Sequence, residues 1–188
     1  RIAKGVKEFG KMIDGHIVDA KNTNTSKGAV VSLKDLLRDI DGLIGMHDVK
    51  RDVRSLVNKI QIDKQRQSMG LPVVGLTNHM VFTGNPGTGK TTLARRIGEI
   101  YHCLGLLSRG HLIEADRSAL VAGYLGQTAI KTTKVLDTAL GGILFIDEAY
   151  TLNQRNGGNA DQFGLEAIDT ILKYMEDNKE SIMVIAAG

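Results

Sequence analysis

The feature that most constrains this chain is a glycine-rich octapeptide, GNPGTGKT, at positions 84–91. It matches the pattern G-x-x-x-x-G-K-[ST] at every fixed position, and a short apolar stretch precedes it. Small residues let the backbone wrap closely around a large anion, so that successive N–H groups point at its oxygens. A helix that begins at Lys90 would add the positive end of its dipole. The octapeptide therefore predicts a strand–loop–helix unit that binds the phosphates of a nucleotide.

The side chains of this loop have separate expected roles. The ammonium group of Lys90 neutralises the β- and γ-phosphates, so Lys90 is a candidate catalytic residue as well as a nucleotide contact. The hydroxyl of Thr91 is a candidate ligand for Mg²⁺. The other candidate nucleotide contacts are Gly84, Asn85, Pro86, Gly87, Thr88, Gly89 and Thr92. The loop thus predicts a nucleoside triphosphate bound together with magnesium.

A second candidate part of the same site is the segment GILFIDE, positions 142–148. It is an apolar run that ends in two carboxylates, and because an unpaired buried charge is costly, these carboxylates are expected to face a ligand. Asp147 would orient the magnesium ion through a water molecule, and Glu148 would activate the attacking water as a general base. An apolar run followed by Asp-Glu is common by itself, and the glycine-rich loop upstream favours the functional interpretation.

The remaining chain alternates between strand and helix patterns. Strands are expected at 80–82, 111–115, 142–147 and 181–187, and helices at 2–13, 33–40, 47–68, 90–101, 127–139 and 161–177. Ser32 is expected to cap the helix that follows it. Strands that are apolar on both faces and alternate with helices indicate a parallel sheet covered by helices. The predicted fold is α/β, a P-loop NTPase three-layer sandwich with a parallel sheet.

Composition and charge limit the classes of partner that this chain is expected to bind. Residues 1–78 carry 14 basic and 9 acidic side chains, mixed in sign, which is typical of a solvated helix surface. Residues 79–188 carry 10 basic and 12 acidic side chains. They show no basic–aromatic interleaving, which argues against nucleic acid as a partner. No apolar run approaches the roughly 18 residues of a membrane span. The single cysteine, Cys103, is expected to be buried, and a lone cysteine fits a cytoplasmic location.

In combination these features resemble the AAA+ ATPases. The stretch DGLIGMHDVK, at 41–50, resembles the segment that packs against adenine in that family, which makes Ile44 and Gly45 candidate base contacts. The stretch FGLEAIDTILKYMEDN, at 163–178, followed by a strand, resembles one branch in particular. That branch holds the red-type Rubisco activases, the sporulation stage V protein K-like ATPases and the type VII secretion ATPases. The resemblance covers about residues 40–188.

The segment GYLGQTAIKT, at 123–132, resembles the central pore loop of the same family. Its aromatic–apolar–glycine triplet is Tyr124, Leu125 and Gly126. The alternative for Tyr124 is a core aromatic, but the glycines on both sides favour a loop, where packing does not need a large ring.

The resemblance implies an ATP hydrolase with ATP and Mg²⁺ as cofactors. It also implies a homo-oligomeric ring, usually a hexamer, whose pore loops pull a protein substrate. Two alternatives stay open: a nucleotide-gated scaffold with little turnover, and a nucleic-acid motor of the clamp-loader or branch-migration kind. The sequence leaves the substrate, the pathway and the ring size undetermined.

The resemblance also implies a domain division. Residues 1–40, which include the polar stretch KNTNTSKG, are expected to be an N-terminal segment or linker of unknown role. Residues 41–188 are expected to be the AAA+ large subdomain, which stops before the family's sensor residue, fifth strand, arginine finger and helical lid. Turnover by these residues alone is therefore expected to be weak or absent. Arg155, in a glycine–asparagine stretch, is expected to lie in a mobile surface loop and not to be the finger.

Overall fold

The structure is a computed structural model that divides the chain into two compact units, Arg1–Val30 and Val31–Gly188. The described residues all lie in the second unit and are 32–43, 47–73, 79–124, 126–156 and 159–188. The helix expected near 2–13 and the polar stretch at 21–28 lie outside them.

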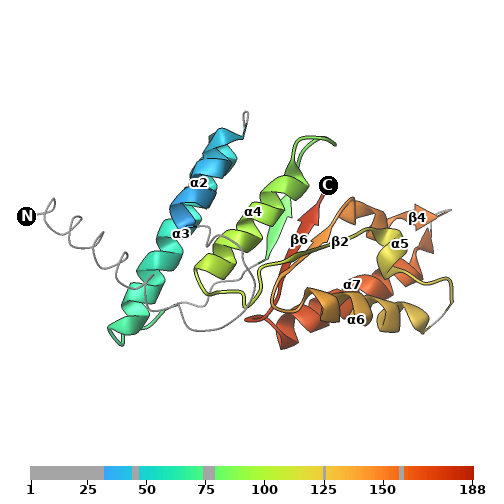
Figure 1. Cartoon of the computed structure of the whole chain (residues 1–188). Coiled ribbons are helices and arrows are strands. Elements are labelled where there is room, and N and C mark those ends of the chain that lie inside the picture. The colour runs from blue at the N-terminus through green and yellow to red at the C-terminus, as the bar shows by residue number, and fades with distance from the viewer. Residues whose placement is uncertain (1–31, 44–46, 74–78, 125, 157–158) are drawn as a thin grey trace, which may run out of the picture. The chain divides into compact units, whose positions relative to one another are not determined.

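A four-stranded parallel sheet forms the centre of the second unit (Figure 1). Its strands are β1 (Met80–Phe82), β2 (Leu112–Ala115), β3 (Ile143–Ile146) and β6 (Met183–Ala187). They lie in the order β1-β6-β3-β2. Strands that follow one another in the chain are joined by crossovers, because parallel strands cannot be joined by hairpins. In the register, Phe82 pairs with Ala187 and Ile146 pairs with Ala186. The carboxyl ends of β1 and β3 are therefore level to within about one residue, on either side of β6.

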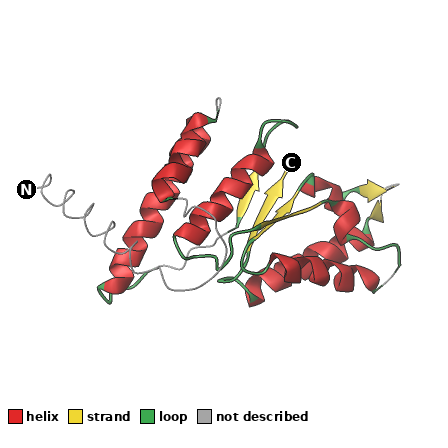
Figure 2. Ribbon diagram, viewed as in Figure 1, coloured by secondary structure: helices red, strands yellow, loops and turns green. Residues whose placement is uncertain are grey.

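Helices cover both faces of the sheet (Figure 2). One face is covered by α2 (Leu33–Gly42), α3 (His47–Ser68) and α4 (Lys90–Cys103), and the other by α5 (Arg117–Leu120), α6 (Gln127–Ala139), the short 3₁₀ helix η1 (Ala149–Asn153) and α7 (Gln162–Asp177). Within β3, Ile143 and Phe145 join the first core cluster, whereas Leu144 and Ile146 join the second. This alternation follows from the two-residue period of a strand. The predicted three-layer α/β sandwich is confirmed, and the predicted elements within the described residues lie within two residues of their expected bounds.

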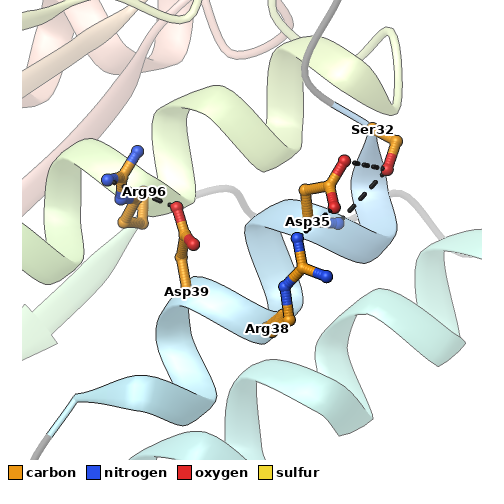
Figure 3. Close-up of polar contacts among 5 residues, drawn as sticks. All are labelled: Ser32, Asp35, Arg38, Asp39 and Arg96. Carbon is orange, nitrogen blue, oxygen red and sulfur yellow. Dashed lines mark hydrogen bonds and ion pairs between the residues drawn. The ribbon is translucent and has the colours of Figure 1, made fainter.

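The start of α2 is specified locally (Figure 3). Ser32 Oγ accepts a hydrogen bond from the backbone N–H of Asp35 at 3.2 Å and donates one to the Asp35 carboxylate at 2.7 Å. These contacts satisfy N-terminal groups that the helix itself leaves unpaired. The hydrogen bond from Ser32 lowers the pKa of Asp35, and the nearby charge of Arg38 acts in the same direction. The prediction that Ser32 caps this helix is confirmed.

Tertiary packing then fixes α2 against α4. Leu36 and Ile40 are each 2% exposed and belong to the core cluster that includes α4. On the surface, Asp39 of α2 lies 3.4 Å from Arg96 of α4, a contact visible in Figure 3. Exposed pairs of this kind contribute little, so the apolar contacts dominate. Helix α2 thus belongs to the second unit, which begins at Val31. The predicted division had placed the start of the nucleotide-binding part at residue 41.

Strand β1 is less buried than its three apolar residues would indicate. Val81 is 74% exposed, and Met80 and Phe82 are half-buried. Among the described residues β1 pairs with β6 alone, which makes it an edge strand. The sequence shows three apolar residues but not whether a neighbour covers both sides of them.

The stretch around Arg155, predicted to be a loop, contains two short strands. Strand β4 (Arg155–Asn156) pairs antiparallel with β5 (Asn159–Ala160). Two short segments separated by a Gly-Gly pair have the composition of a two-residue hairpin, a signal that could have been read from the sequence. Helices α5 and η1 were not predicted, because four or five residues carry no readable periodicity. Cys103 is exposed, so its expected burial is wrong.

Candidate functional site

The glycine-rich loop connects the carboxyl end of β1 to the first residue of α4. Three of its glycines have positive φ angles, which are 154° at Gly84, 77° at Gly87 and 84° at Gly89. Glycine adopts such angles without the steric penalty that other residues pay. Gly89 is the N-cap of α4 and offers no side-chain cap to the helix. The first N–H groups of α4 thus have no side-chain partner at the cap and are available to an anion.

The side chain of Lys90 turns back over this loop. Its Nζ donates hydrogen bonds to the carbonyl oxygens of Gly84 at 2.6 Å and Asn85 at 3.2 Å. Thr88 Oγ1 also donates to the Asn85 carbonyl, at 2.8 Å. The lysine ammonium therefore lies at the loop, where a phosphate held by the backbone N–H groups would meet it.

The remaining loop residues differ in exposure. Thr91 is half-buried at the start of α4. The residues from Gly84 to Thr88, which include Pro86, are exposed, as is Thr92. All the predicted phosphate-binding residues thus lie on one continuous turn, with the hydroxyl of Thr91 at its helical end.

Asp147 and Glu148 follow directly after β3. The four residues of β3 are buried, whereas both carboxylates are exposed. Glu148 has φ 48° and ψ 43°, and it is the single non-glycine residue with positive φ in the described part of the chain. Its N–H donates to Asp147 Oδ1 at 3.0 Å. Strained backbone of this kind persists where the surroundings hold it in place and is concentrated at functional sites.

Strand β6 links these two parts of the site. The N–H of Gly84 donates to the carbonyl of Gly188 at 3.1 Å, and the N–H of Gly188 donates to Phe82 at 3.0 Å. On the other side of β6, Ile146 pairs with Ala186, so Asp147 begins one residue beyond that pair. The loop and the two carboxylates therefore lie together at the carboxyl ends of the strands, where open α/β sheets bind their ligands.

The donor atoms at these strand ends suit magnesium. The hydroxyl of Thr91 and the carboxylate of Asp147 are hard oxygen ligands, and Mg²⁺ is usually held by one or two protein oxygens together with phosphate oxygens and water. Among the described residues no group of three or more His, Cys, Asp and Glu side chains could hold a metal ion. Two hard oxygen donors, from Thr91 and Asp147, would suit an ion that also binds phosphate oxygens.

A pocket of about 600 Å³ adjoins the loop. Gly84, Thr88 and Lys90 form one side of it, and an apolar wall of α3 forms another, with Val49, Val53 and Leu56. Such a wall beside a phosphate loop suits the flat, apolar faces of a base. Sequence periodicity indicates that these three residues form an apolar stripe, but it does not distinguish a pocket wall from core. Ile44 and Gly45, the predicted base contacts, lie outside the described residues.

The predicted pore loop is separate from these residues in the chain. Tyr124 is 73% exposed in the connection between α5 and α6, so it is not a core aromatic. Gly126 has φ 78° and caps α6. Leu125 lies outside the described residues.

Comparison with known proteins agrees with this geometry. Residues 80–188, more than half of the chain, match the ATPase family associated with various cellular activities (AAA). The chain belongs to this family. The family match covers β1, the glycine-rich loop, β3 with its two carboxylates, and β6.

Three relatives represent the branch predicted from the sequence. The chain is 47% identical to stage V sporulation protein K of Bacillus subtilis over 156 residues, which are 83% of this chain and 48% of that protein. It is 45% identical to the ESX-1 secretion system protein EccA1 of Mycolicibacterium smegmatis over 150 residues, 80% of this chain and 26% of that protein. It is 46% identical to a chloroplastic ribulose bisphosphate carboxylase/oxygenase activase of Cyanidioschyzon merolae over 155 residues, 82% of this chain and 50% of that protein.

The predicted branch is thereby confirmed. The chain spans half or less of the length of these curated relatives. No helix in the described part of the chain is long and apolar enough to cross a membrane.

Proposed function

We propose that this chain is the nucleotide-binding part of a motor that hydrolyses Mg-ATP to remodel or translocate a protein through the pore of a homo-oligomeric ring. One observation carries the proposal: the register of β1, β6 and β3 brings the Lys90 loop and the Asp147–Glu148 pair to the same ends of the strands, the carboxyl ends. Phosphoryl transfer requires little covalent participation by the protein, so catalysis rests on positioning and charge. The residues at the carboxyl ends of these strands supply both the positioning and the charge.

The reaction is transfer of the γ-phosphoryl group of ATP to water. Lys90 and the N–H groups at the start of α4 stabilise negative charge on the phosphate oxygens. Thr91 and Asp147 would hold a magnesium ion, which adds positive charge at the β- and γ-phosphates. Glu148 would accept the proton of the attacking water. Glu148 is exposed in its left-handed turn, whereas the strand that precedes it is buried.

The proposed substrate is a protein. The matched activase is named for an enzyme, ribulose bisphosphate carboxylase/oxygenase, and EccA1 is named for a secretion system. Tyr124 adds an exposed aromatic ring that could grip an extended peptide. Loops held by a rigid scaffold often carry binding residues, and Tyr124 lies in such a connection.

The catalytic assignment is tested by Glu148→Gln in the complete protein. The amide keeps the shape of the side chain but cannot take a proton from water, so ATP binding should persist and turnover should fall below about a tenth of the wild-type rate. Binding is measured by calorimetry and turnover by phosphate release. Glu176→Gln, at an exposed position of α7, is the matched control and should leave turnover unchanged. Normal turnover in Glu148→Gln would exclude Glu148 as the base.

The remodelling assignment is tested by Tyr124→Ala. Removal of the ring should lower the amount of protein substrate remodelled per ATP hydrolysed, because the loop would then slip on the peptide. Tyr124→Phe keeps the ring and should retain most of this coupling. An unchanged ratio of remodelling to hydrolysis in Tyr124→Ala would remove Tyr124 from the proposed grip.

A further inference from the structure

Arg117, the first residue of α5, contacts two other elements at once. Its Nη1 donates a hydrogen bond to the carbonyl of Thr151 in η1 at 3.0 Å, and its Nη2 forms an ion pair with Asp161, the N-cap of α7. Asp161 Oδ1 in turn accepts a hydrogen bond from the N–H of Phe163 at 3.2 Å. Among the described residues, Arg117 supplies the sole side-chain hydrogen bond to η1. The guanidinium group thus joins α5, η1 and the start of α7.

The surroundings of this group are tightly packed. The Asp161 side chain is 8% exposed and that of Arg117 is 31% exposed, so the ion pair is largely withdrawn from water. A Cβ at Gly164 would collide with the carbonyl of Leu152 and would lie 3.0 Å from Arg117 Nη1. A planar fork with fixed donors suits such a site, and lysine does not reproduce it.

One side of this junction leads to the catalytic turn. The carbonyl of Thr151 accepts from Arg117, and the N–H of Thr151 donates to the carbonyl of Glu148 at 2.8 Å. Thr151 therefore links Arg117 to the strained backbone of Glu148 through two hydrogen bonds. Any change in the Glu148 turn moves the carbonyl that Arg117 holds.

The other side leads to the Tyr124 loop. Helix α5 lies beside α6 (Figure 1), and it also contacts η1. Lys131 Nζ of α6 donates to the carbonyls of Ser118 at 2.6 Å and Val121 at 3.0 Å, and Thr132 Oγ1 donates to Leu120 at 3.0 Å. These bonds tie the two helices that flank Tyr124 into one unit. A shift of α5 is therefore delivered to both ends of the loop.

We propose that Arg117 is the positioning residue that couples the Glu148 turn to the Tyr124 loop. This inference rests on the proposed function of those two sites. Arg117 touches neither the nucleotide loop nor Tyr124, and it acts by passing a displacement of η1 to α5. Energetic coupling of this kind needs an element that both sites bias, and the α5–α6 pair is that element here.

The experiment uses a fluorescent reporter at the loop. The 188 residues contain no tryptophan, so Tyr124→Trp introduces a single indole at the position of interest. Mg-ATPγS is added to this reporter chain, and its binding is measured separately by calorimetry. The same titration is repeated with Arg117→Lys, which keeps a positive charge beside Asp161 but loses the fixed fork that reaches Thr151. Arg117→Ala is the second variant, and circular dichroism establishes that each chain is folded.

The matched control is Arg95→Ala in the reporter chain. Arg95 forms an exposed ion pair with Glu114 of β2 at 2.8 Å, so its loss removes a guanidinium of equal size without touching η1 or α5. Nucleotide should change the indole emission in the parent reporter chain and in the control. In Arg117→Lys the change should fall to less than about half, while the nucleotide dissociation constant shifts by less than about tenfold, a difference of about 1.4 kcal/mol.

The outcomes separate the two ideas. Failure of every chain to bind Mg-ATPγS would overturn the proposed function, and the inference with it. Normal binding with no change in indole emission in the parent reporter chain would overturn the inference alone. So would a full emission change in Arg117→Lys, or an equal loss of that change in Arg95→Ala.

Discussion

At the scale of single residues, the shape of the site depends on a few backbone angles. Glu148 adopts a left-handed conformation that costs a non-glycine residue on the order of 1–3 kcal/mol, and the hydrogen bonds of its turn to Asp147 and Thr151 hold it there. The glycines of the phosphate loop reach similar angles without this cost. The loop therefore takes its shape from its composition, whereas Glu148 takes its shape from its neighbours.

His79 provides a pH-dependent contact at the start of β1. Its Nδ1 accepts a hydrogen bond from the N–H of Val184 at 3.1 Å, which requires that this nitrogen carry no proton. Burial lowers the pKa of His79. The unfolded chain therefore takes up a proton at a higher pH than the folded chain does. The free energy of unfolding should fall as the pH drops through the ordinary histidine pKa of about 6.5.

The substitution His79→Asn tests this expectation. Asparagine Oδ1 can occupy nearly the same position as the accepting nitrogen, and it does not titrate. The loss of stability between about pH 7.5 and pH 5.5 should be smaller in the variant than in the parent chain. Urea unfolding at several pH values measures it. Parallel pH profiles for the two chains would show that His79 is not the group responsible.

At the scale of elements, position in the sheet decides how each strand is buried. Strand β3 lies between β6 and β2, and all four of its residues are buried. Strand β1 is equally apolar but lies at the edge. Val81 pairs with Ala186 and so lies on the face covered by α7, where a pocket of about 290 Å³ leaves it exposed. Composition is thus a poor guide to burial where a sheet ends.

Helix α4 approaches the sheet through a glycine. A Cβ on Gly98 would lie 2.5 Å from the carbonyl oxygen of Gly110 and 3.1 Å from Ile143 Cδ1. Gly98→Ala should therefore lower the free energy of unfolding by about 1–3 kcal/mol through overpacking, and the gain in helix propensity of about 1 kcal/mol offsets only part of this. Urea unfolding measures the difference.

The control for this prediction is Gly42→Ala, the same substitution in α2. A Cβ at Gly42 would meet no atom within 4 Å, so stability should change by less than about 1 kcal/mol. Equal effects of the two substitutions would contradict the assigned close approach between α4 and the backbone at Gly110.

At the scale of the whole molecule, the β1 edge is the most exposed apolar feature of the sheet. Val81 is 74% exposed, and pockets lie beside β1 on both faces. An exposed apolar edge strand offers unpaired N–H and C=O groups to another chain, and natural proteins often protect such edges with charge or cover. The 188-residue chain is therefore expected to self-associate through this edge.

Val81→Lys should reduce that association, because a charged side chain on an edge strand opposes strand pairing. Sedimentation velocity over a range of protein concentrations measures the association. Ile130→Lys is the control: Ile130 is 60% exposed on α6, away from any strand, and its replacement should have little effect. If the two variants associate equally, the β1 edge is not the surface responsible.

Features that depend on local chemistry could be predicted from the amino-acid sequence. The pattern at 84–91 specifies a loop that only glycine-rich backbone can form, and Ser32 specifies the start of α2 through a contact three residues away. Alternating apolar strands and amphipathic helices specify a parallel sheet with two covering layers, because each element must bury its apolar surface. The branch of the family also follows from local motifs.

Features that join distant segments of the chain could not be predicted, because they depend on how the elements pack. Val81 and Ile146 are similar apolar residues, and the order of the strands alone makes one exposed and the other buried. Arg117, in an unpredicted helix, reaches the loop that follows Glu148 across 34 positions of sequence. Such contacts leave no periodicity to read, because their partners are set by how the layers pack and not by spacing along the chain.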